Sequence, residues 1–130
     1  MFGRKRTFKC PIEVVVSLIE NKWKWTIFHE LLEGTKRFGE LRRDISGVSQ
    51  KVLTQTLRSM EKDRMVKRKI YSQVPPKVEY SMTAVAIDFY EVLHHMATWG
   101  RKYCRMMHIP LTCKPPKLLA KSTRFVIDNA

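Results

Sequence analysis

The sequence predicts a mainly α-helical protein with one small β-hairpin, and three observations support this fold class. Apolar residues recur at helical spacing in the first half of the chain. After Arg64 the spacing changes to strict alternation, which is typical of strands. A long helical pattern returns after Thr83. The 130 residues, 44% of them apolar, can build the core of one domain without a disulfide or a structural metal.

Four helices are predicted before the change in spacing. Pro11 suits the first turn of a helix, and Asn21 and Ser49 are residues that cap helix N-termini. Gly34 is a residue that ends helices. The third and fourth helices are separated by a Ser-Gly turn. The predicted helices cover about residues 11–19, 22–33, 38–45 and 49–62.

A hairpin and a fifth helix follow. The first predicted strand places Val66, Arg68, Ile70 and Ser72 on one face and Met65, Lys67, Lys69 and Tyr71 on the other. The segment 74–77, with two prolines, breaks this strand, and residues 78–82 form its partner. Thr83 can cap a helix that continues toward Met106. Two helices joined by a glycine-containing turn and followed by a basic hairpin define a winged helix-turn-helix.

The charge balance favours a polyanionic partner. Lys and Arg number 25 against 12 Asp and Glu, a formal net charge of +13. No secretory signal and no membrane span is readable, and the cysteine count is odd, so we expect a soluble cytoplasmic protein with free thiols. Residues 1–9 are expected to form a basic N-terminal arm, 10–107 the domain, and 108–130 a basic C-terminal tail.

The fourth helix carries the candidate DNA-reading face. Leu53, Leu57 and Met60 recur at i, i+4 and i+7 and are expected in the core. The opposite face mixes amides, a hydroxyl and cations without an acid, which suits base edges and phosphates. An ordinary solvated helix face is the alternative, as is a purely solubilising role for the wing lysines. The candidate DNA-binding residues are Arg42, Arg43, Ser49, Gln50, Lys51, Thr54, Gln55, Arg58, Lys67, Arg68, Lys69 and Lys77.

The order and spacing of several short segments resemble the HxlR-type regulators, winged-helix proteins related to the MarR group. The match covers about residues 10–100, and its specificity lies in the combination of the segments. They are Cys10-Pro11-Ile12-Glu13, Lys22-Trp23-Lys24, 37–41, 45–54, Leu57-Arg58, 74–83 and Trp99-Gly100.

The resemblance implies how such a protein acts. It implies a homodimer joined by the first and last helices, an operator with two-fold symmetry, and repression more often than activation. It also implies that the fourth helix and the wing contact DNA. This sequence departs from the family pattern at three places: Glu20-Asn21 stands where Gly-Gly is usual, Arg64-Met65 where Gly-Leu or Gly-Ile is usual, and Ala86 where a glycine is usual. Arg64 must therefore adopt a positive φ or avoid it through a different turn.

Cys10 is a candidate redox or electrophile sensor. It precedes a helix whose N-terminus favours the thiolate, and some proteins of the resembling family sense oxidants or electrophiles through this cysteine. The alternative is a small residue packed against a dimer partner. The set Cys104, His108 and Cys113 and the pair His94-His95 are poor metal ligands, and one histidine of the pair is expected to face the core and the other solvent.

An effector pocket between the last helix and the DNA-binding helices is a further possibility. Methionines could line it, although core packing explains them better. The methionines concerned are Met60, Met65, Met82, Met96, Met106 and Met107.

Three functions compete: a DNA-binding regulator, a winged-helix module that binds RNA or protein, and an enzyme. The sequence has no Gly-rich phosphate loop, no HExxH, no CxxC and no nucleophile-elbow motif. We therefore expect no enzyme and no cofactor. The partners expected are double-stranded DNA, a second copy of the chain and a possible small-molecule or electrophile effector, with no membrane. Exposed apolar patches on the recognition helix would instead favour the protein-binding module.

Overall fold

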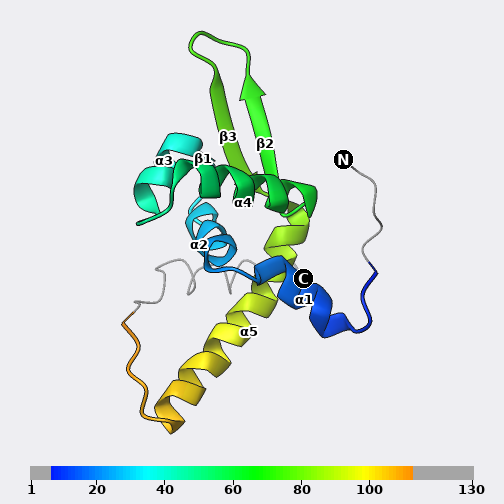
Figure 1. Cartoon of the computed structure of the whole chain (residues 1–130), viewed down its shortest axis with the longest axis vertical. Helices are drawn as coiled ribbons and strands as arrows, with labels where there is room; N and C mark the ends of the chain where they lie inside the picture. Colours follow the sequence, from blue (N-terminus) through cyan, green and yellow to red (C-terminus); the bar gives the residue numbers. More distant parts are fainter. Residues whose placement is uncertain (1–6, 113–130) are drawn as a thin grey trace, which may run out of the picture.

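The computed structural model describes residues 7–112 and shows a helical body from which a wing projects (Figure 1). Most of the expected basic arm and tail, Cys113 included, lies outside the described residues. The elements are α1 (Pro11–Ile19), α2 (Lys22–Leu31), β1 (Lys36–Arg37), α3 (Phe38–Asp44), α4 (Gln50–Lys62), β2 (Val66–Tyr71), β3 (Lys77–Met82) and α5 (Ala84–Met106).

The helix starts are those that the sequence predicts. The side chains of Asn21, Ser49 and Thr83 each accept a hydrogen bond from a backbone N–H two or three residues ahead, at 3.0–3.1 Å. Each bond satisfies a donor that the first turn of a helix leaves without a partner. Local side-chain chemistry therefore sets where α2, α4 and α5 begin.

The core lies between α2, α4 and the first half of α5, with α3 closing one side. Leu53, Leu57 and Met60 are buried, which confirms the predicted inward face of α4. They meet Ile27 and Phe28 of α2, both fully buried. Burying α4 in this way directs its polar residues outward.

The predicted hairpin is confirmed, and the sheet also has a third strand that the sequence did not predict. Strands β2 and β3 pair antiparallel from Val66↔Met82 to Tyr71↔Lys77. Strand β1 pairs antiparallel with the other edge of β3, through Lys36↔Tyr80 and Arg37↔Glu79. Two residues are too short a run to show alternation, so only the pairing partner reveals this strand.

The turn after α4 resolves the question posed by Arg64. Arg64 adopts a φ of 60°, the left-handed conformation that glycine usually supplies. Its N–H donates to the Glu61 carbonyl (3.0 Å), and the Met65 N–H donates to the Met60 carbonyl (2.9 Å). These two bonds are a Schellman motif. Thr83 Oγ1, which caps α5, also donates to the Arg64 carbonyl (2.6 Å). The turn thus ties the end of α4 to β2 and to α5.

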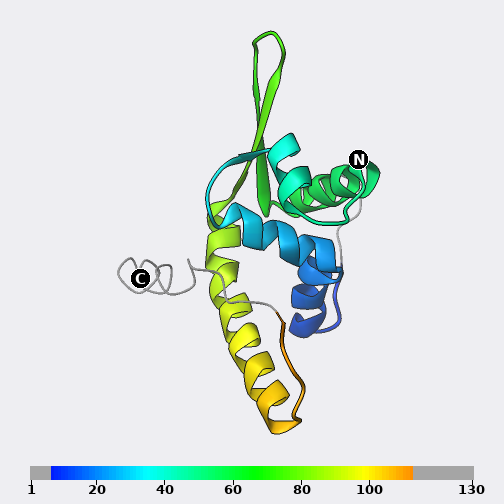
Figure 2. The ribbon, with the colours of Figure 1, turned by 90° about the vertical axis from the view of Figure 1, so that its left-hand side faces the viewer.

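Helix α5 has 23 residues and passes through Gly100 without interruption. In Figure 2 its first turns lie against the helical body and its second half extends beyond α2. The sequence analysis did not separate two apolar faces of this helix, of which only one is buried. Tyr90 and Leu93 are buried as expected, whereas Ile87 is 43% and Trp99 59% exposed.

Six of the exposed apolar residues of α5 form a stripe with spacings of seven, four, three, four and three residues, a heptad-like seam. We call it the α5 stripe. Its residues are Val85, Val92, Met96, Trp99, Tyr103 and Met106. Its side chains are 40–59% exposed in the described chain.

Candidate nucleic-acid interface

The outward face of α4 presents polar side chains without an acid over residues 50–58, and Glu61, one turn further along, pairs with Arg68 of the wing. Gln50, Lys51, Gln55 and Arg58 are exposed, as the sequence predicts. Thr54 is half-buried, and its hydroxyl donates to the Gln50 carbonyl (2.8 Å), so its proton is already engaged. The remaining four side chains offer amide and cationic groups that suit base edges.

Helix α3 adds cations beside the start of α4. Arg42 and Arg43 are exposed in the last turn of α3. Arg42 Nη1 donates to Gln50 Oε1 at 3.4 Å, a weak bond that connects the two helices. Ser49 is exposed, but its Oγ accepts the capping bond from Val52 N–H. Its first role is therefore to start α4.

The four basic residues of the wing differ in whether a neighbouring carboxylate pairs with them. Lys67 and Lys69 are exposed, and the Lys69 ammonium lies 4.9 Å from the centre of the Tyr71 ring. Arg68 lies within 3.7 Å of Glu61, which partly neutralises it. Of the four, Lys67 and Lys69 are the two exposed cations for which no ion pair with a carboxylate is seen in the part of the chain described.

Lys77 is engaged within the wing. Its ammonium forms an ion pair with Glu79 (2.8 Å) and lies over the Tyr71 ring, and the Tyr71 hydroxyl donates to the same carboxylate (3.0 Å). The Lys77 hydrogen bond lowers the pKa of Glu79 despite an opposing desolvation effect. Lys77 therefore stabilises the hairpin before it can meet a phosphate.

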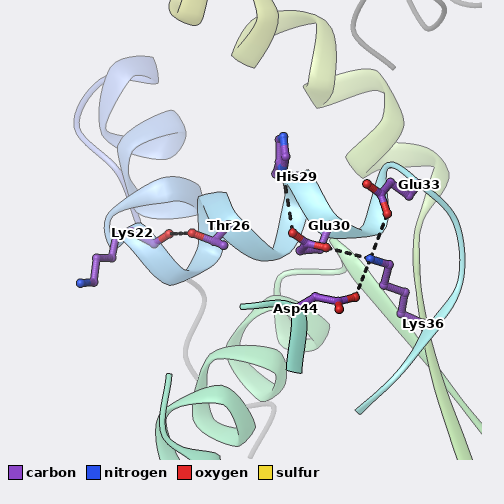
Figure 3. Close-up of polar contacts among 7 residues, drawn as sticks. All are labelled: Lys22, Thr26, His29, Glu30, Glu33, Lys36 and Asp44. Carbon is purple, nitrogen blue, oxygen red and sulfur yellow. Dashed lines mark hydrogen bonds and ion pairs between the residues drawn. The ribbon is translucent and has the colours of Figure 1, made fainter. Parts of the chain in front are cut away.

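The buried Lys36 connects α3 to α2 through an ion-pair cluster that the sequence did not predict (Figure 3). Its ammonium lies 2.7 Å from Glu30, 3.1 Å from Glu33 and 3.0 Å from Asp44. Burial alone would lower the pKa of Lys36, but hydrogen bonds to Glu30, Asp44 and Glu33 outweigh it and raise that pKa. The cluster joins α2, β1 and the last turn of α3. No spacing rule connects these four positions.

Cys10 is exposed and forms the N-cap of α1, as the sequence predicts. Its side chain makes no capping hydrogen bond, and its carbonyl accepts from Glu13 N–H at 3.2 Å. The nearby Glu13 carboxylate accepts a hydrogen bond from Lys9 N–H (2.9 Å). The thiol is thus accessible at a helix N-terminus.

An apolar pocket of about 400 Å³ lies between α1, α2 and α5, with Trp25, Met96 and Cys104 among its lining residues. Met60 and Met65 are core residues and Met82 packs against the core, whereas Met106 and Met107 are exposed. Core packing therefore explains half of the methionines. Only Met96, of the six, lines the pocket.

The metal-ligand candidates do not converge. Among residues 7–112, no three His, Cys, Asp or Glu side chains gather where they could hold a metal ion. His94 Nδ1 is buried and His95 is exposed, which confirms their expected orientations. Within the same residues, no helix combines the length and apolar character of a membrane span.

The fold and the basic α4 face define a winged helix-turn-helix DNA-binding protein. The sequence model of the HxlR-like helix-turn-helix family matches residues 18–108. The chain is 43% identical over 94 residues to the uncharacterized HTH-type transcriptional regulator YdeP of Bacillus subtilis, covering 72% of this chain and 73% of the relative. This protein therefore belongs to the HxlR-like helix-turn-helix family of transcriptional regulators and is not an enzyme.

Solved structures agree with this assignment. The redox regulator HypR in its oxidized form superposes with a TM-score of 0.65 and 41% identity, over 72% of this chain and 96% of that one. A MarR-family regulator of Enterococcus faecalis V583 superposes with a TM-score of 0.71 and 37% identity, over 82% and 96% of the two chains.

The substitution Lys36→Met should destabilise the fold by about 2 kcal/mol, because three carboxylates would lose their shared cation. Since the pKa of Lys36 is raised, this contribution is fully present below the ordinary lysine range and is lost only as the pH rises beyond it. Urea unfolding at neutral pH measures the change. The exposed Lys102→Met is the control, and a loss no larger than that of the control would contradict the role of the cluster.

Proposed function

We propose that this regulator binds a specific operator by placing α4 in the major groove. The observation that carries this proposal is the exposed, acid-free face made by Gln50, Lys51, Gln55 and Arg58. Glutamine suits an adenine edge, and arginine or lysine suits guanine. Arg42, Arg43, Lys67 and Lys69 lie on the flanking elements, where cations can neutralise phosphates.

A module that binds RNA or protein is the second candidate, and the recognition surface does not favour a protein partner. No large apolar side chain of α3 or α4 is exposed. We also propose that the protein represses transcription and that it acts in the cytoplasm. Its DNA-binding domain is proposed to cover residues 10–107, with a basic arm before it and a basic tail after it.

The variant Arg58→Ala should weaken binding to the specific operator by about 1–3 kcal/mol and relax base preference at one position. Lys69→Ala should instead weaken binding to all duplexes and reduce the dependence of affinity on salt. Fluorescence anisotropy with specific and random duplexes at several salt concentrations measures both. Equal losses on the two duplexes for both variants would show that Arg58 does not read bases.

We further propose a homodimer joined through α1 and α5. The α5 stripe supports this, because a long exposed apolar seam stabilises a chain only when a second surface covers it. Ile12 and Val16 of α1 are also exposed. A two-fold dimer would place its recognition helices in successive major grooves, roughly 34–36 Å apart.

The variant Trp99→Glu should convert the dimer to a monomer, because it places a charge in the middle of the α5 stripe. Light scattering during gel filtration should then give the 15.4 kDa chain mass in place of twice that mass. The matched control is Ile87→Glu, an exposed apolar residue of α5 outside the stripe. If Trp99→Glu still has twice the chain mass, the α5 stripe is not the dimer interface.

Cys10 is proposed as a redox or electrophile sensor. Its exposed thiol lies at the N-terminus of α1, where a reagent in solvent can reach it. The structural relative HypR is named a redox regulator. Modification of Cys10 would add a bulky group at the N-terminus of α1, one of the two helices of the proposed dimer interface. A small-molecule effector in the pocket beside α5 would act close to the same helices.

Exposure to N-ethylmaleimide should lower operator affinity of the parent protein by about tenfold, or 1.4 kcal/mol. The variant Cys10→Ser should keep its affinity under the same treatment, because it lacks the reacting thiol. Cys104→Ser should respond as the parent does. Release of DNA by Cys10→Ser to the parental extent would eliminate Cys10 as the sensor.

A further inference from the structure

A lysine is buried at the junction of three helices. Lys24 lies in the first turn of α2 and is only 2% exposed. This is an unfavourable place for a cation, because burial removes its hydration and a helix N-terminus carries a partial positive charge. Groups outside α2 must therefore compensate it.

Three oxygen atoms surround the Lys24 ammonium. It donates a hydrogen bond to the Ser17 carbonyl of α1 at 3.1 Å. The Glu20 carboxylate lies 3.6 Å away and the Asp63 carboxylate 3.7 Å away. Asp63 is itself buried, with a side chain 8% exposed, whereas the Glu20 side chain is 60% exposed. The bond to Ser17 and the buried Asp63 therefore provide the contacts that water cannot easily replace.

The same ammonium compensates the ends of two other helices. The Ser17 carbonyl is one of the last four of α1, which have no partner within the helix, and the last turn of α1 contains no basic residue. Asp63 is the C-cap of α4, where a carboxylate adds to the partial negative charge of the helix end. A cation between the two ends favours their close approach.

Lys24 also connects α1 to α4 through α2. Helix α1 packs on α2, and α2 packs on α4. Directly after Asp63 comes Arg64, whose turn leads into the wing. A displacement of α1 can thus reach both the recognition helix and the wing through Lys24.

We propose that Lys24 is a positioning residue that couples α1 to the C-terminal end of α4. It holds the recognition helix in the orientation that α1 dictates, so a change at the N-terminus of α1 alters DNA affinity. The functional part of this inference rests on the proposed operator binding and on the proposed role of Cys10. The mechanical part concerns only contacts within one chain.

The test uses the full chain with Cys104→Ser and Cys113→Ser, so that N-ethylmaleimide modifies Cys10 alone. The test variant adds Lys24→Met and Asp63→Asn together, which removes the cation and the buried carboxylate that faces it. Lys24→Met by itself is the second variant. Lys22→Met, an exposed lysine on the same helix, is the matched control. Thermal unfolding first verifies that each variant is folded.

Two measurements are made before and after modification: operator affinity, and amide hydrogen exchange in residues 60–65. In the parent and in Lys22→Met, modification should change affinity about tenfold and increase exchange in residues 60–65. In the folded Lys24 variants the affinity change should fall below twofold, and exchange should be the same before and after. A Lys24 variant that keeps the full parental response would overturn the coupling.

The exchange measurement separates the two ideas. If parental affinity does not respond but exchange does, the proposed sensor fails and the coupling through Lys24 stands. If modification leaves exchange in residues 60–65 of the parent unchanged, α1 is not coupled to α4 and the inference is wrong.

Discussion

The packing of α4 on the core is the interaction on which the rest of this structure depends. Leu53, Leu57 and Met60 bury one face of the helix against α2. Because the helix is amphipathic, burying this face presents the opposite face, with its amides and cations, to solvent. The same packing fixes the end of α4, from which the Arg64 turn directs the wing. Recognition helix and wing are therefore oriented by one buried surface.

A strongly basic chain must still hold itself together, and several of its acids pair with the two buried lysines, Lys36 and Lys24. Glu30, Glu33 and Asp44 surround Lys36, and Asp63 faces Lys24. Residues 50–58 of α4, which include Lys51 and Arg58, contain no carboxylate. The ion pairs that orient the helices thus also leave the proposed DNA face uncompensated, which is the condition for attracting a polyanion.

Helix α5 has two apolar faces, and only one of them packs within the chain. Tyr90 and Leu93 bury one face in the core of the same chain. The α5 stripe lies on another face and remains uncovered in the described chain. In the proposed dimer this division lets one helix join the DNA-binding lobe to the partner. Lys24, at the meeting point of α1, α2 and α4, gives the proposed sensor helix a physical route to the recognition helix.

The sequence by itself determined the helix starts, the wing hairpin and the basic face of α4. These features depend on neighbours within a few residues, such as the cap at Ser49, so a local pattern is enough to read them. The tertiary structure decided what depends on distant neighbours. Strand β1 exists only through its pairing with β3, and Lys36 and Lys24 become buried only when separate helices meet. It also showed that the Glu79 carboxylate, which pairs with Lys77 on the same strand, accepts a hydrogen bond from the Tyr71 hydroxyl of the neighbouring strand. That cross-strand contact follows from the register of the hairpin and not from the spacing of the residues along the chain.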